Sequence, residues 1–273
     1  MALLDERDWD GHYELMFRLW LERAECEFLT GNFDTAEQLI GELLQRGSSK
    51  IDQAAAYHLK VLLHTVKSEN AQAVDIALKC LRLFGIDMPA HPTWERVQAE
   101  YETVWQTLDG RPIESLIDLP KITDPELQAA MQLLSILTPS AYFTDLHLFP
   151  LLVCRMVNLS MQHGTSGACA HAYGILGHIL GPVFHRYSEG YRFAKLACDV
   201  VEKHGFIAYH AKVEERNRLA GEIHDSLAQC FTGITMQLGR GPPFLCLYHS
   251  TPEASLFSGF AAVFGLTKRH QIF

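Results

Sequence analysis

The sequence is poor in positive charge. Its 23 lysine and arginine residues stand against 32 aspartate and glutamate residues, which gives a formal net charge of -9. A net acidic protein lacks the basic surface with which proteins bind nucleic acid or an anionic membrane leaflet non-specifically. We therefore expect no nucleic-acid partner, and expect basic or neutral partner surfaces instead.

Long apolar runs are absent as well. No uncharged apolar stretch reaches the roughly 20 residues that a membrane-spanning helix needs, and the N-terminus, MALLDERDWDGHYEL, is acidic where a signal peptide is basic and then apolar. The seven cysteines are scattered and include no C-x-x-C pair, which favours reduced core thiols over a disulfide framework or a zinc site. These absences predict a cytoplasmic protein with no direct membrane span.

Strand-like patterns are also missing. No segment alternates apolar and polar residues between turn signals, and apolar residues recur instead at the spacing of buried helix faces. Two such helical patterns in residues 12–47 are joined by a turn at residues 30–33, and a second pair follows with its turn at residues 68–70. The small residue that lets paired helices approach recurs at Ala36 and Ala73, close to the roughly 34-residue period of tetratricopeptide repeats.

More helices are expected further along. Their spans are 94–108, 124–137, 144–163, 166–180 and 186–204. Asp124, Pro125 and Glu126 form a typical helix start, and Gly181-Pro182 is expected to break a helix. We predict an all-α fold in which residues 1–211 form tetratricopeptide-like stacked helical hairpins, followed by a long helix.

That long helix lies in residues 214–238. Apolar residues at positions 219, 223, 227, 231, 234 and 238 form one stripe, and His224 stands at its flank, where a phosphate could reach the imidazole. Asp225 is placed to accept the ring proton when a neutral imidazole attacks. Gln229, one turn further on, could orient a water molecule. By spacing alone, such a His-Asp pair is more often a solvated surface pair.

The string RNRLAGEIHDSLAQ, residues 216–229, resembles the dimerisation and phosphoacceptor motif of the third subgroup of sensor histidine kinases. The resemblance implies that His224 is the autophosphorylated residue, that Asp225 is the general base and that Gln229 assists phosphatase activity. It also implies a dimer, either with a second copy or with a related histidine kinase, and a response regulator as partner. The expected role is two-component signal transduction with His224 in a phosphorelay.

The segments ERAECEFLTGNFDTAEQLI and GPVFHRYSEGYRFAKLACDVVEKHGF resemble the helical-repeat region of cyanobacterial-type multidomain ATPase/histidine kinase proteins. We interpret the chain as a truncated relative with three parts: a repeat domain (1–211), a dimerisation and phosphoacceptor helix (212–239) and an unassigned tail (240–273). No D-x-G-x-G lid motif of an ATP-binding domain follows Leu238. We therefore expect no cofactor on this chain, with ATP and Mg²⁺ supplied through a separate catalytic domain.

Three alternatives stay open beside this interpretation. The chain could be a non-catalytic repeat scaffold that binds protein partners. Cys169 with His171, His178 and His185 could align metal ligands on one helix, although no carboxylate lies among them, and we predict no metal site. The aromatic and arginine residues of 184–193 could stack on bases, although hairpin packing is the commoner role of such residues in an acidic helical array.

Overall fold

The computed structural model describes residues 8–206. The chain divides into two units, residues 1–207 and 208–273, and all described residues belong to the first. Between residues 8 and 206 the chain forms ten α-helices, one short 3-10 helix and no strand, with a single isolated bridge between Lys121 and Thr165. The predicted all-α fold is confirmed for these residues, and the predicted phosphoacceptor helix lies outside them.

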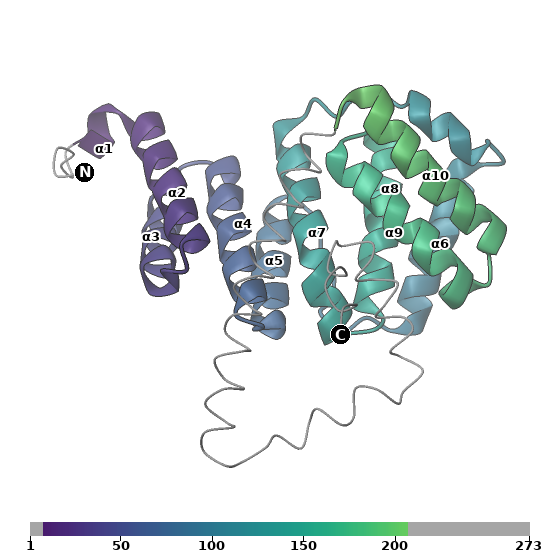
Figure 1. Cartoon of the computed structure of the whole chain (residues 1–273), viewed down its shortest axis with the longest axis horizontal. Coiled ribbons are helices and arrows are strands. Elements are labelled where there is room, and N and C mark those ends of the chain that lie inside the picture. The colour runs from purple at the N-terminus through teal and green to yellow at the C-terminus, as the bar shows by residue number, and fades with distance from the viewer. Residues whose placement is uncertain (1–7, 207–273) are drawn as a thin grey trace, which may run out of the picture. The chain divides into compact units, whose positions relative to one another are not determined.

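Most helices follow one another through short connections, and longer connections stand on either side of α6 (Figure 1). Their bounds are α1 (Asp8–Gly11), α2 (Tyr13–Leu29), α3 (Phe33–Arg46), α4 (Lys50–Val66), α5 (Asn70–Leu83), α6 (Trp94–Leu108), η1 (Ile113–Asp118), α7 (Pro125–Thr144), α8 (Leu148–His163), α9 (Gly167–Phe184) and α10 (Tyr187–His204). The expected turns at residues 30–33 and 68–70 lie where α2 meets α3 and α4 meets α5, so both predicted hairpins are confirmed.

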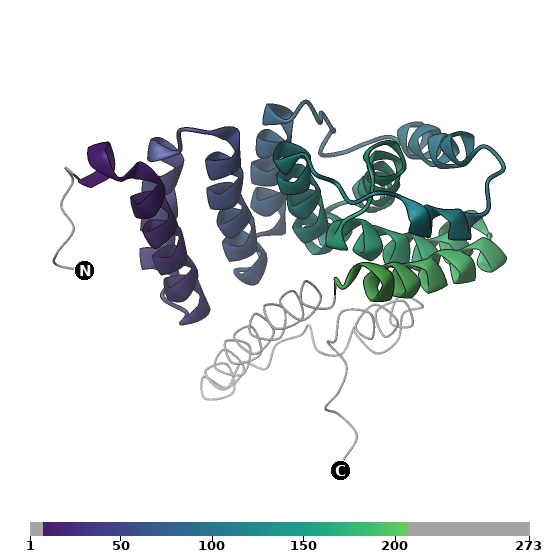
Figure 2. The same cartoon turned by 90° about the horizontal axis from the view of Figure 1, so that it is seen from above.

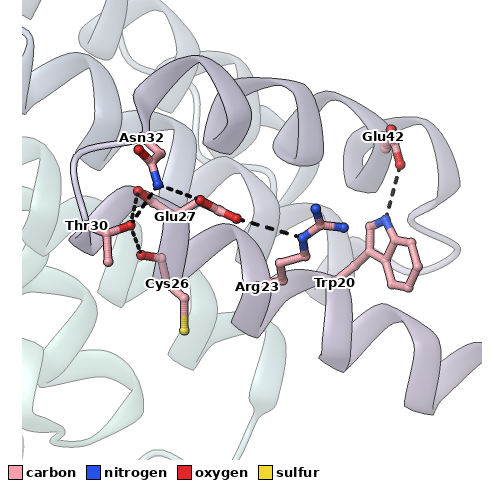
Figure 3. A network of polar contacts seen from close by, with 7 residues as sticks. All are labelled: Trp20, Arg23, Cys26, Glu27, Thr30, Asn32 and Glu42. Atoms are coloured by element: carbon pink, nitrogen blue, oxygen red, sulfur yellow. Dashed lines mark hydrogen bonds and ion pairs between the residues drawn. The ribbon is translucent and has the colours of Figure 1, made fainter. Parts of the chain in front are cut away.

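The α2–α3 turn is closed by side chains as well as by backbone (Figure 3). Thr30 donates its hydroxyl to the carbonyl oxygen of Cys26 at 2.9 Å, and the Asn32 amide donates to the Glu27 carboxylate at 2.9 Å. Between them Gly31 has φ +82°, a conformation that glycine adopts without steric cost. The turn residues therefore stop α2 and start α3 within three positions.

Small residues bring the paired helices close. Ala24, Ala36 and Ala73 are completely buried, and α3 of the first hairpin packs on α4 of the second. The stack continues with α7, which contacts both α4 and α5. In this way the small-residue positions read from the sequence lie in the interior of the array.

The next hairpins pair α7 with α8 and α9 with α10, and α6 stands outside this order. Helix α6 packs mainly on α8, where the Asn158 amide donates to the carbonyl oxygen of Glu100 at 3.0 Å and to its carboxylate at 2.8 Å. The sequence predicted the bounds of α6 but not this position outside the hairpin stack.

Helix α7 begins as predicted and ends later than predicted. The Asp124 carboxylate accepts the backbone N–H of Glu126 at 2.9 Å, which caps the first turn. The helix then passes through Pro139 and reaches Thr144. Proline has no N–H for the carbonyl four residues earlier, but that carbonyl, on Ser135, accepts the Thr138 hydroxyl at 2.7 Å. The local replacement removes the cost of an unsatisfied acceptor, so the helix continues.

The predicted break at Gly181-Pro182 is wrong. Helix α9 contains both residues and ends at Phe184, where the Arg186 N–H bonds to the carbonyl oxygen of Leu180 at 2.8 Å. A side chain at Gly181 would place its Cβ 2.7 Å from the ring of Tyr187. The Tyr187 ring thus packs where a Gly181 side chain would be, and Pro182 lies only two residues before the end of α9, so its missing N–H removes a single hydrogen bond of the last turn.

Candidate functional site

The predicted site residues His224, Asp225 and Gln229 lie outside the described residues. The described part of the chain ends shortly before them, with α10 and the two residues that follow it. The geometry that bears on the site is therefore the way in which α10 is held. Three sets of contacts do this: one with α9, one with α6 and one with the connection between α6 and α7.

The contact of α10 with α9 is a close approach of two backbones. A Cβ on Gly177 would lie 2.7 Å from the backbone nitrogen of Ala194 and 2.7 Å from the carbonyl oxygen of Gly190. A Cβ on Gly190 would likewise lie 2.7 Å from the carbonyl oxygen of Gly177. Real Cβ atoms do not come this close to other heavy atoms, so each helix needs glycine where it faces the other.

Aromatic side chains of α9 and α10 also pack against α6. The ring of Phe184 stacks on Tyr101 with centroids 3.8 Å apart and planes 3° apart. Phe193 is completely buried and has its centroid 6.2 Å from that of Trp105. The Arg186 guanidinium lies 4.2 Å from the centroid of the Trp105 ring, a favourable cation–π contact. The predicted hairpin packing is confirmed for Phe184, Arg186 and Phe193, whereas the Tyr187 and Tyr191 rings of the same cluster are exposed over 70% and 72% of their surface.

The histidine series proposed as metal ligands serves other contacts. His171 Nδ1 shares a hydrogen bond with the Ser135 hydroxyl at 2.9 Å, the Cys169 thiol lies 3.2 Å from the Ser166 hydroxyl, and His185 ends α9 with φ 56°. Within residues 8–206 no three histidine, cysteine or acidic side chains are grouped to hold a metal ion. For the whole chain, the absence of a metal stays a prediction.

The described cysteines fall into a buried group and an exposed group. Cys80, Cys154 and Cys169 are buried, as the sequence suggested, whereas Cys26 and Cys198 are exposed. None of these five forms a disulfide. Among the same described residues, no helix has the length and hydropathy to cross a membrane.

Comparison with known proteins finds a family match in the segment that follows α10. A family model described as histidine kinase matches residues 215–242, which include His224, Asp225 and Gln229. The matches support a relation to sensor histidine kinases. A curated relative, hybrid signal transduction histidine kinase G of Dictyostelium discoideum, is 22% identical over 218 residues. No solved structure matches the chain.

The match to the curated relative extends beyond the segment with His224. It covers 73% of this chain and 6% of the relative, so the chain spans only a small part of the relative's length. Residues 215–273 make up less than a quarter of the chain. A match over 73% must therefore include much of the helical region as well as, or instead of, the segment with His224.

Sequence reasoning missed the charged residues that tie α10 to the connection between α6 and α7. Glu114 and Asp118 of this connection pair with Arg192 and Lys203 of α10. Spaced charges in residues 114–121 were the only available signal. Such charges are typical of any solvated loop, and their partners lie about 80 residues away, so no local pattern indicates the pairing.

Proposed function

We propose that this chain acts in two-component signal transduction, with His224 as the phosphoacceptor of a sensor histidine kinase system. The observation that carries the proposal is the family match at residues 215–242, which spans the histidine and both of its neighbours with assigned roles. The match to a hybrid signal transduction histidine kinase supports the same class of function.

The proposed step is transfer of a phosphoryl group to the imidazole of His224. One ring nitrogen attacks the γ-phosphorus of ATP, the bond from that phosphorus to the bridging oxygen breaks, and ADP leaves with the bond's electron pair. Asp225 accepts the proton from the other ring nitrogen, so that the attacking nitrogen keeps its lone pair available. ATP and Mg²⁺ are bound by a separate catalytic domain in this proposal.

Two later events complete the proposed cycle. The phosphoryl group passes from His224 to an aspartate of a response regulator. Gln229 orients a water molecule that hydrolyses the phosphorylated regulator, which is an acid–base and positioning role open to an amide. Dimerisation through residues 212–239, with a second copy or a related histidine kinase, brings the phosphoacceptor to its catalytic domain.

Labelling with ATP tests the phosphoacceptor. The purified chain is incubated with labelled ATP and a complete kinase of the same subgroup, and acid-labile label is measured. We expect label on the wild type and on His163→Ala, a matched control that removes an exposed histidine of α8, and none on His224→Ala. Equal labelling of the wild type and His224→Ala contradicts the proposal. Asp225→Asn should slow labelling at least about 100-fold, the typical contribution of a general base.

The stacked hairpins favour one second function, a scaffold. Arrays of this kind bind proteins along their helices, and the described residues consist of such hairpins together with α6. A binding assay on residues 1–211, added to the labelling experiment, distinguishes the two functions. If residues 1–211 bind a partner while His224 never accepts phosphate, the chain is a scaffold.

A further inference from the structure

The connection between α6 and α7 contains a strap, residues 113–121, that lies beside α10 (Figure 2). Ile113 and Leu116 anchor the strap in the core with 2% and 0% of their surface exposed. At its far end the backbone is bonded to the α8–α9 turn, since Thr165 donates its N–H to the carbonyl oxygen of Pro120 at 2.7 Å. The strap is therefore fixed to the interior at both ends.

Charged side chains project from this fixed strap onto α10. Glu114 accepts two hydrogen bonds from the Arg192 guanidinium at 2.7 and 2.6 Å, and Asp118 accepts one from Lys203 at 2.6 Å. Arg192 and Lys203 lie about three helical turns apart and so share a face of α10. The two ion pairs thus hold α10 at two levels of one face.

The strap also closes the end of α10. Lys121 donates its ammonium to the carbonyl oxygen of His204 at 3.0 Å, and His204 donates Nε2–H to the carbonyl oxygen of Ile117 at 3.2 Å. A carbonyl in the last turn of a helix has no partner within the helix and favours a nearby cation. The Lys121 ammonium further lies 5.3 Å from the ring centroid of Phe206, the last described residue.

Burial shows which part of α10 depends on these contacts. The buried residues of α10 are Gly190, Phe193, Leu196 and Val200, so contact with the core ends one turn before the helix does. Beyond Val200, hydrogen bonds with Ile117, Asp118 and Lys121 connect the helix end to the strap. The strap therefore helps to hold the last turn of α10, whereas α9 and the core hold the rest of the helix.

We propose that the strap is an electrostatic clasp that holds the last turn of α10, and that salt or a charged partner opens it. The clasp rests on the contacts above and is independent of the proposed function. Because Asp118 and Lys203 are exposed over 76% and 44% of their side chains, salt screens their attraction. The clasp is consequently sensitive to ionic strength and to charged partners that compete for either side.

Hydrogen–deuterium exchange on the full chain tests the clasp. Asp118→Asn and Lys203→Gln should each make the amides of residues 201–206 exchange about two to five times faster, the effect of losing one exposed ion pair. The double variant should exchange no faster than the faster single variant, because both changes remove the same pair.

The matched control is Asp87→Asn, which removes an exposed aspartate paired with Arg82 at 3.0 Å near the end of α5. It should leave exchange in residues 201–206 unchanged, and raising salt from 50 to 500 mM should move the wild type towards the single variants. Unchanged exchange in residues 201–206 of both single variants overturns the clasp. A chain that takes no label on His224 refutes the proposed function and leaves these readouts unaffected.

Discussion

At the scale of single residues, burial gives the described cysteines different chemistry. Desolvation raises the pKa of Cys80 from its ordinary 9.0 to about 12, and it raises the pKa of Cys154 and Cys169 as well. The thiolate is the reactive form of cysteine. A thiol with a pKa three units above the ordinary value has about a thousandfold less thiolate at neutral pH. The buried cysteines are structural by this criterion.

Alkylation therefore distinguishes the two groups. We expect iodoacetamide at pH 8 to modify the exposed Cys26 and Cys198 while Cys80 and Cys154 stay unmodified in the folded chain. Peptide mass spectrometry at increasing times measures this order, and unfolding in guanidinium serves as the control in which all four react. Early modification of Cys154 under native conditions would show that the core opens readily and that its burial gives no protection.

Proline and glycine are the residues at which local rules were least reliable. Pro139 does not end α7, because the Thr138 hydroxyl replaces the lost donor, and α9 continues through Gly181 to Phe184, with the Tyr187 ring beside the glycine. By contrast, Gly31 does mark a turn, and its φ is +82°. Whether a glycine ends a helix depends on which residues pack against it, and the local sequence does not contain that information.

At the scale of elements, the α9–α10 contact is a close approach of two helix backbones at Gly177 and Gly190. We expect Gly177→Ala to destabilise the protein by about 1–3 kcal/mol, because its Cβ would push the two backbones apart. Gly174→Ala is the matched control on the same helix, since its Cβ would lie 3.7 Å from Ala197, an ordinary contact. Alanine there should be neutral or stabilising by about 0.5–1 kcal/mol.

Urea unfolding of the two variants measures this difference. The midpoint should fall for Gly177→Ala and should hold or rise for Gly174→Ala, with similar slopes. Equal midpoints for Gly177→Ala and the wild type would mean that the helices separate without cost and that the close approach is not required.

The bounds of individual helices were easier to predict than which helices pack against one another. The bounds of α6 and the start of α7 were visible in the spacing of apolar residues and in the Asp124 cap. The pairing of α7 with α8, and the placement of α6 against α8, were not, because every amphipathic helix offers an apolar face that several neighbours could cover. The residues that decide between neighbours, such as Asn158 and Glu100, lie far apart in the chain.

At the scale of the whole molecule, the described residues contain their own core. Large buried side chains from α2 to α10, including Met16, Leu63, Leu134, Tyr173 and Phe193, pack among described helices. We therefore expect a chain that ends at residue 206 to fold without residues 207–273. Circular dichroism should show a helical spectrum and a thermal transition.

A shorter chain that ends at residue 166 provides the control. It lacks α9 and α10, and with them the buried Tyr173 and Phe193, so it should lose the transition or aggregate. If the chain that ends at residue 206 is itself unfolded, the array depends on residues beyond it, and the proposal of a separate signalling segment after α10 would need revision.

The sequence by itself determined the all-α class, the two N-terminal hairpins and the residues proposed for phosphoryl transfer, because each depends on local spacing. His224, Asp225 and Gln229 stand within six positions of one another, and the family match covers that same short segment. Only the tertiary structure decided that α6 stands outside the hairpin order and that α10 rests on glycines. It alone also brought the strap to the end of α10. These features depend on which distant side chains meet, and close packing and charge pairing between such residues leave no periodic trace in the chain.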